Sequence, residues 1–342
     1  MTWVTWRQFR GQAIASGAVL LAVAVVLAVT GPNLVWKYDN AGLTTCHASC
    51  AALAGNFVSA IKFGSDGTIF YATILVMYLA PALIGTFWGA PLIAREFEAG
   101  THRIAWNQSV TRTRWAAAKL GLIGLAAMAT AGLLSLMVSW WASPIDHALA
   151  QTGQASVFGS RISPLVFAAR GVAPLGSAAF AFALGVTVGL LIRRTIPAMA
   201  VTLALFAVVQ VLMTSFVQPH LIPPDQLTAP LRPPVLTEMM IQSPGNEMTL
   251  RGNATVPGAY VLSNTTITPT GKVFTGPATA ACINGNGNDC NTWIASKHLR
   301  QLLTYQPASR FWPLQWVETA LYLVLAAGLG WLCAWQVRRR RS

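Results

Sequence analysis

Residues 171–192 read GVAPLGSAAFAFALGVTVGLLI, and this stretch decides the class of fold. It contains no charged residue from one end to the other. A helix that rises 1.5 Å per residue needs about 20 apolar residues to cross a hydrocarbon layer of about 30 Å. The stretch is therefore predicted to cross a membrane as a single helix.

Five further apolar runs of similar length lie on either side of it. The whole chain is 54% hydrophobic and 10% charged, whereas a soluble domain carries about 25% charged residues. Glu318 lies near the end of the last run, where a long side chain can reach the interface. We expect an all-α membrane protein with six transmembrane helices. The other runs are Ala13–Thr30, Ile69–Ala94, Ala116–Trp140, Ile196–Val217 and Leu314–Val337.

The basic residues predict the orientation of these spans. Short cytoplasmic loops carry an excess of Lys and Arg, and 13 of the 23 basic residues fall on one side of the predicted spans. Both termini are therefore expected in the cytoplasm of a multi-pass cell-membrane protein. The net charge of +13 comes from basic residues that lie between apolar runs and not along a solvated groove with interleaved aromatic residues. Nucleic acid is therefore not expected as a partner. The residues on the inner side are Arg7, Arg10, Arg95, Arg103, Arg112, Arg114, Lys119, Arg193, Arg194 and Arg338 to Arg341.

The polar segments between the spans divide the chain into regions. Residues 13–217 would hold the first five spans, and residues 314–342 the sixth span with a basic cytoplasmic tail. Residues 218–313 are too polar to span and would form a large extracellular segment. Alternating residues at Ala259–Ile267 indicate short strands there.

Two polar segments, residues 34–68 and 218–313, are expected outside the cell. Four of the five cysteines fall in these segments, where disulfides form. Local pairing is the favoured connectivity, although four cysteines permit three. Cys46 with His47 offers a metal site as the alternative, but no second Cys or His pair lies nearby, so no metal is predicted. The four cysteines are Cys46, Cys50, Cys282 and Cys290.

The chain carries no motif that would supply energy for transport. A GxxxxGK[ST] phosphate-binding loop is absent, and the Gly271–Lys272 pair is followed by valine. No apolar run holds Asp, Glu or His at its centre, where ion-coupled carriers place them. We therefore expect no cofactor in this chain, and ATP and Mg²⁺ on a separate cytoplasmic ATPase.

The cytoplasmic loop 95–115 holds the predicted contact with that ATPase, within the stretch REFEAGTHRIAWNQS at 95–109. The glutamates would prolong the second span, the glycine would end that helix, and the threonine would cap a new one. A solvated loop is the alternative, but it explains only the arginines. The predicted coupling residues are Glu96, Glu98, Gly100, Thr101, His102, Arg103, Ile104 and Trp106.

Two further patterns concern helix packing and the N-terminus. Trp3, Trp6 and Phe9 recur at helical spacing and predict an amphipathic helix over residues 1–12 at the membrane interface. The pairs Gly85 with Gly89 and Gly185 with Gly189 let helices approach closely, either inside the bundle or across a dimer.

The motifs ARExExGT at 94–101 and WNQSVTRTRW at 106–115, with SRFWPLQWVET at 309–319, resemble ABC exporter permeases. The resemblance is to the ABCG-like, type V fold and in particular to its actinobacterial members. It implies a connecting helix at Thr2–Gln12 and a coupling helix at about Thr101–Ser109. It also implies a homodimer of permeases, each resting on one copy of a separate ATPase, with substrate moving outward. The long segment 218–313 departs from many relatives.

The leading hypothesis is export of a small amphipathic molecule such as a drug, antibiotic, peptide or lipid-like compound. Phe87 in the second span and Phe206 in the fifth are the candidate substrate contacts. The alternative is a non-transporting membrane sensor or assembly factor whose outer segment binds a ligand. An intramembrane enzyme is disfavoured, because the sequence has no paired aspartates and no HExxH motif.

Overall fold

Helix α8 (Ala173–Ile192) is the central element of a helical bundle, because most of its residues are buried against neighbouring helices. It lies within the uncharged stretch 171–192 that predicts a membrane span. A helix that contacts other helices on every side has no need of a polar face. The computed structural model describes residues 2–47, 50–98, 112–152, 158–231, 236–242, 247–252, 254–277, 279–283 and 287–339.

Six helices in the described part of the chain are long and apolar enough to cross a membrane, which confirms the predicted all-α membrane protein. Most continue beyond the apolar runs, since a helix does not end where the hydrocarbon ends. The spans are formed by α1 (Thr2–Asn40); α3 (Ser65–Leu83), η1 (Ile84–Gly89) and α4 (Ala90–Glu98); α6 (Arg112–Gln151); α8; α9 (Thr195–Leu212), η2 (Met213–Val217) and η3 (Gln218–His220); and α12 (Phe311–Arg339).

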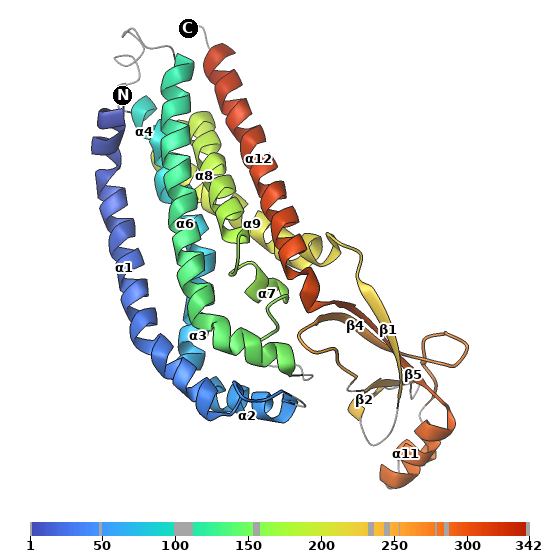
Figure 1. Cartoon of the computed structure of the whole chain (residues 1–342). Helices are drawn as coiled ribbons and strands as arrows, with labels where there is room; N and C mark the ends of the chain where they lie inside the picture. The colour runs from blue at the N-terminus through green and yellow to red at the C-terminus, as the bar shows by residue number, and fades with distance from the viewer. Residues whose placement is uncertain are drawn as a thin grey trace.

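The first span and the N-terminal segment form one helix. α1 runs without a break from Thr2, so the helix expected over residues 1–12 continues directly into the span. α1 contains Pro32 and α6 contains Pro144, and both helices curve in their outer parts (Figure 1). Proline inside a helix removes a backbone hydrogen bond and bends the axis.

Two glycine pairs bring η1 and α8 into backbone contact. A Cβ atom on Gly85 would lie 2.6 Å from the carbonyl oxygen of Ala181, and one on Gly89 would lie 2.6 Å from that of Phe182. From the other side, a Cβ on Gly185 would collide with the carbonyl of Gly85. These glycines therefore serve packing inside the bundle, which was one of the two roles that their spacing allowed.

The start of α1 and the end of α12 lie at one end of the bundle, which we name the inner end, and a lobe of strands lies at the other, which we name the outer end (Figure 1). The termini share their end with the turn between α8 and α9. The lobe shares its end with the short helices α2 (Ala51–Lys62) and α7 (Pro164–Phe167). Lys37 of α1 and Asp66 of α3 form an ion pair of 2.6 Å between their outer ends.

The outer lobe contains the strands predicted near residues 259–267. Its three-stranded antiparallel sheet has the order β1–β5–β4, and β2 pairs with β3 in a separate hairpin. Leu250, Ile294 and Leu299 lie in its small apolar core. The elements of the lobe are β1 (Asp225–Pro230), β2 (Leu236–Gln242), β3 (Glu247–Gly252), β4 (Tyr260–Ile267), α10 (Ala280–Ile283), α11 (Gly287–Ser296) and β5 (Arg300–Gln306), and η4 (Ala308–Arg310) leads on to α12.

The chain enters and leaves this lobe at one point. The amide of Gln306, at the end of β5, donates to the carbonyl of Ile222 at 2.6 Å, just before β1. Arg310 in η4 donates to the carbonyl of Pro223 and pairs with Asp225, each at 2.5 Å. These contacts fasten the start of α12 to the segment that follows η3.

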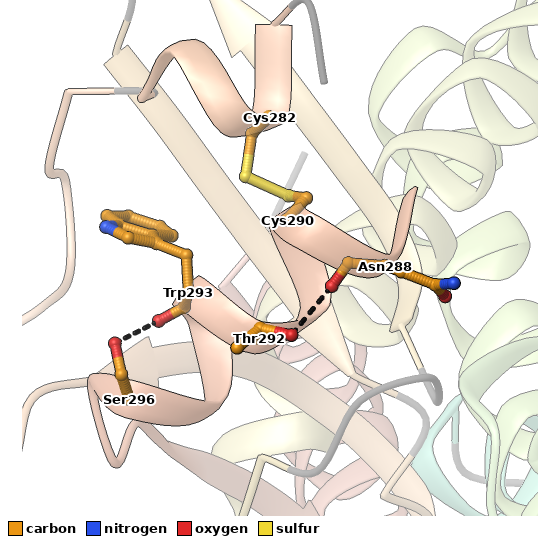
Figure 2. The surroundings of a disulfide bond; sticks show 6 residues. All are labelled: Cys282, Asn288, Cys290, Thr292, Trp293 and Ser296. Atoms are coloured by element: carbon orange, nitrogen blue, oxygen red, sulfur yellow. Dashed lines mark hydrogen bonds between the residues drawn. A yellow bond between two sulfur atoms is a disulfide. The ribbon is translucent and has the colours of Figure 1, made fainter. Parts of the chain in front are cut away.

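Both disulfides join cysteines close in sequence, which is the connectivity favoured by their spacing. Cys46 pairs with Cys50 at a Cα–Cα distance of 5.9 Å, and Cys282 pairs with Cys290 at 4.6 Å. The second bond ties α10 to α11, above Trp293 (Figure 2). Because Cys46 is oxidised, it cannot provide the thiolate that the alternative metal site requires.

The glycine contact predicts a clear effect of one methyl group. We expect Gly185→Ala to lower the thermal midpoint of the detergent-solubilised protein, because the new Cβ would force η1 away from α8. Gly328→Ala in α12 is the matched control, since a Cβ there meets nothing within 4 Å. Alanine raises helix propensity by about 1 kcal/mol over glycine, so the control should be neutral or stabilised. Equal midpoints for both variants would contradict the packing assignment.

The disulfides predict a thiol count. Alkylation of the unfolded chain without reductant should label only Cys333, the cysteine outside the two bonds, and reduction should raise the count to five. Intact mass spectrometry measures both values. Full labelling before reduction would show that the bonds do not form.

Candidate functional site

The inner end of α4 is fastened to the turn between α8 and α9. The carboxylate of Glu98 accepts a hydrogen bond from the backbone N–H of Thr195 at 3.0 Å and another from its hydroxyl at 2.5 Å. Thr195 begins α9, so the carboxylate lies at the positive end of that helix, where an anion is favoured. Glu98 was predicted as a coupling residue, but its contact with α9 was not foreseen.

A second contact beside it involves the preceding residue of α4. The guanidinium of Arg193 lies 5.5 Å from the centre of the Phe97 ring. Arg193 has a φ of 59°, the left-handed conformation that ends α8. Two residues, Arg193 and Arg194, separate the end of α8 from the start of α9, so α4 holds this tight connection through both contacts.

Of the other predicted coupling residues, the structure describes only Glu96. Glu96 lies in α4, as expected if the second span is prolonged to Glu98. The remaining six lie outside the described residues, and with them the predicted coupling helix 101–109. These are Gly100, Thr101, His102, Arg103, Ile104 and Trp106.

The two candidate substrate contacts differ in environment. Phe87, in η1, is 49% exposed, and its carbonyl accepts a hydrogen bond from Gln12 at 2.7 Å. Phe206, in α9, is only 3% exposed and lies 6.5 Å from the ring of Phe180. The structure does not bring the two rings together.

A cavity of about 480 Å³, lined by both charged and apolar side chains, lies at the opposite end of the bundle. It is bounded by the outer half of α6, the loop before α8 and the start of α12. Residues that matter for its chemistry are Ser139, Asp146, Ser160, Arg161, Arg170 and Trp312. Asp146 lies beyond the predicted end of the third span at Trp140, and no role in a site was predicted for Arg161 or Arg170, so this site was missed.

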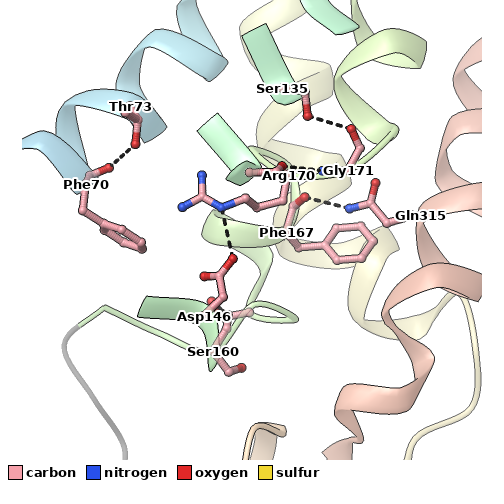
Figure 3. A network of polar contacts seen from close by, with 11 residues as sticks. Phe70, Thr73, Ser135, Asp146, Ser160, Phe167, Arg170, Gly171 and Gln315 are labelled. Atoms are coloured by element: carbon pink, nitrogen blue, oxygen red, sulfur yellow. Dashed lines mark hydrogen bonds and ion pairs between the residues drawn. The ribbon is translucent and has the colours of Figure 1, made fainter. Parts of the chain in front are cut away.

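Arg170 is the most buried cation of this cavity, with 1% of its side chain exposed. Its Nε atom lies 3.5 Å from Oδ2 of Asp146, and its guanidinium lies 5.3 Å from the centre of the Phe70 ring (Figure 3). Burial lowers the pKa of Arg170 below its ordinary value, and the Asp146 carboxylate opposes that shift. Arginine stays protonated even so, because its ordinary pKa lies far above neutral pH.

Gln315 of α12 fixes the backbone around this arginine. Its side-chain oxygen accepts hydrogen bonds from the N–H groups of Val172 and Ala173 at 2.9 and 2.7 Å, and its amide donates to the carbonyl of Phe167 at 2.9 Å (Figure 3). The side chain thereby caps the N-terminus of α8. Gly171, with φ of 64°, passes so close that a Cβ would lie 2.8 Å from the same oxygen.

Glu318 corrects one expectation from the sequence. It was expected to reach the interface from near the end of the last apolar run. Instead Glu318 is 2% exposed within α12. The reason is packing: α12 lies along α8 and turns this face inward.

The six long apolar helices define a multi-pass membrane protein. Within the described ranges, no group of three potential metal ligands is present. The family described as "ABC-2 membrane transporter related" matches residues 17–218, so the chain belongs to that family. Neither a curated protein nor a solved structure matches the chain.

Family membership makes this chain a transporter membrane subunit of the ABC-2 permease type, a type that works with an ABC ATPase. The matched region ends at residue 218, where the helices give way to the outer lobe. The first five spans therefore carry the family likeness, and both the lobe and the sixth span, α12, lie beyond the matched region.

The bonds of Gln315 predict a loss of stability on its replacement. Gln315→Leu removes the acceptor of the Val172 and Ala173 N–H groups at the start of α8, which should cost about 1–3 kcal/mol in the free energy of unfolding. Gln315→Glu is the matched control, because it keeps an acceptor at the N-terminus of α8. A thermal midpoint for Gln315→Leu at or above that of Gln315→Glu would refute the capping role.

Proposed function

We propose that this chain is the permease subunit of an ATP-driven ABC exporter that moves a small amphipathic molecule outward. Two copies would form a homodimer that rests on two copies of a separate ATPase. ATP and Mg²⁺ would bind to that ATPase. The substrate classes that suit an apolar, six-span path are drugs, antibiotics, peptides and lipid-like molecules.

The proposed orientation places both termini in the cytoplasm of a cell. Two observations support it. The basic residues concentrate on the side of the termini, as cytoplasmic loops require. The lobe at the opposite end carries a disulfide, and disulfides persist in oxidising compartments.

The contact between Glu98 and Thr195 carries the proposal of ATPase coupling. Glu98 is the last residue of α4, immediately before the predicted coupling segment, and its bonds end on the first residue of α9. A push on that segment by an ATPase would therefore reach α9 through two hydrogen bonds. Coupling between distant sites requires such a connected chain of contacts.

This route also suggests how a substrate would reach the fifth span. Phe87 is exposed and available to a substrate in the described conformation, whereas Phe206 is packed against α8. A substrate would contact Phe206 only after α9 moves away from α8. The proposed path therefore opens when the inner turn is displaced.

The test uses the complex purified from its native membrane. Glu98→Ala should leave insertion and ATPase binding intact but lower ATP-driven transport into inside-out vesicles. We expect a loss of about fivefold or more, because the coupling free energy between two sites usually corresponds to a factor of that size. Glu98→Gln is the matched control, because its carbonyl oxygen still accepts from the N–H of Thr195. It should retain most of the transport.

Two outcomes would overturn these assignments. Full transport by Glu98→Ala would refute coupling through this contact. A chain that purifies without any ATPase, and that binds no added ABC ATPase, would refute the exporter. The alternative of a membrane sensor or assembly factor, with the outer lobe as its ligand-binding part, would then stand.

A further inference from the structure

The cavity near Arg170 holds more positive charge than its own acidic residue can balance. Arg161 and Arg170 both line it, and Asp146 is the one acidic residue among its lining groups. Asp146 pairs with Arg170 at 3.5 Å, while the Arg161 guanidinium stacks 3.7 Å above the Phe311 ring. One arginine charge is therefore left without a carboxylate in this site.

Several buried hydrogen-bond donors of the residues that line the cavity also lack acceptors. Both terminal nitrogens of Arg170 and the hydroxyl of Ser160 are buried, and none of them has a hydrogen-bond partner among the described residues. In Figure 3 the terminal nitrogens of Arg170 point away from Asp146. The nearby Phe70 ring attracts the cation but accepts no conventional hydrogen bond. Buried donors without acceptors are costly, so an arrangement of this kind suits a bound acceptor.

The rim of the cavity is apolar and faces outward from the bundle. Leu136 of α6 is 69% exposed and Trp312 of α12 is 51% exposed, and both line the cavity. Apolar side chains exposed on membrane-spanning helices face lipid or another apolar partner. Trp312 lies at the first turn of α12, where the span begins. The cavity thus combines a cationic floor with a rim suited to acyl chains.

We propose that this cavity binds the phosphate headgroup of an amphiphile, with Arg161, Arg170 and Ser160 as its donors. The planar guanidinium offers paired donors that match the oxygens of a phosphate. The volume of about 480 Å³ lies within the range of small-ligand sites. The site is independent of the proposed coupling to an ATPase, since binding is measured on the permease chain alone.

The experiment titrates the full-length chain, purified in a neutral detergent, with short-chain phosphatidylglycerol and counts bound lipid by native mass spectrometry. Phosphatidylcholine of the same chain length tests the need for net negative charge and should bind more weakly. Arg161→Gln should weaken phosphatidylglycerol binding by about tenfold, as for one lost charge-assisted hydrogen bond. Ser160→Ala should weaken it by about threefold.

Asp146→Asn supplies a change in the opposite direction. It removes the anion that competes with the headgroup, so affinity should rise by about fivefold. Arg300→Gln removes a charge from an exposed position on β5 and is the matched control, with no expected change. Elution volume on size-exclusion chromatography verifies the fold of each variant. Arg170 itself is not replaced, because its removal would leave Asp146 as a buried charge without a partner.

Competition by inorganic phosphate distinguishes the two ligands that could supply the phosphate, a lipid headgroup and free phosphate. Displacement of the lipid at millimolar phosphate would identify a free-phosphate site, and retention of the lipid would identify an amphiphile site. Both results uphold an oxyanion site. Equal phosphatidylglycerol binding by the wild type, Arg161→Gln and Asp146→Asn would overturn it.

Discussion

The backbone contact between η1 and α8 is the constraint on which the bundle depends. With Gly85 and Gly89 facing Gly185 and Gly189, the second span approaches α8 more closely than any side chain allows. This contact fixes the separation between η1 and α8, and the other spans pack around that pair. Without a hydrophobic drive between helices in lipid, such close packing supplies much of the attraction.

The same central helix relates the two ends of the molecule. At its start, Gln315 caps α8 and orders the loop that carries Arg170. At its end, Arg193 and the neighbouring Thr195 are held by the last turn of α4. The cationic cavity and the inner turn are therefore fixed to opposite ends of one rigid element. A displacement of α8 would be felt at both.

The sequence was informative where one local property decides the outcome. Long apolar runs reveal spans, because the cost of burying charge in lipid acts on each segment alone. The third apolar run ended at Trp140, whereas α6 continues to Gln151, because a helix can extend beyond the apolar residues that reveal it. The cavity was not predicted because Asp146, Arg170 and Trp312 meet only through tertiary packing. Glu318 was misjudged for the same reason: its burial depends on how α12 faces α8.

The single point at which the chain enters and leaves the outer lobe has an evolutionary meaning. Gln306 and Arg310 fasten the two connections side by side, at the position where the family match ends. A segment joined in this way behaves as an exchangeable module. Its length and surface can diverge between relatives while α9 and α12 keep their places, so selection can reshape the outer face without remaking the membrane part.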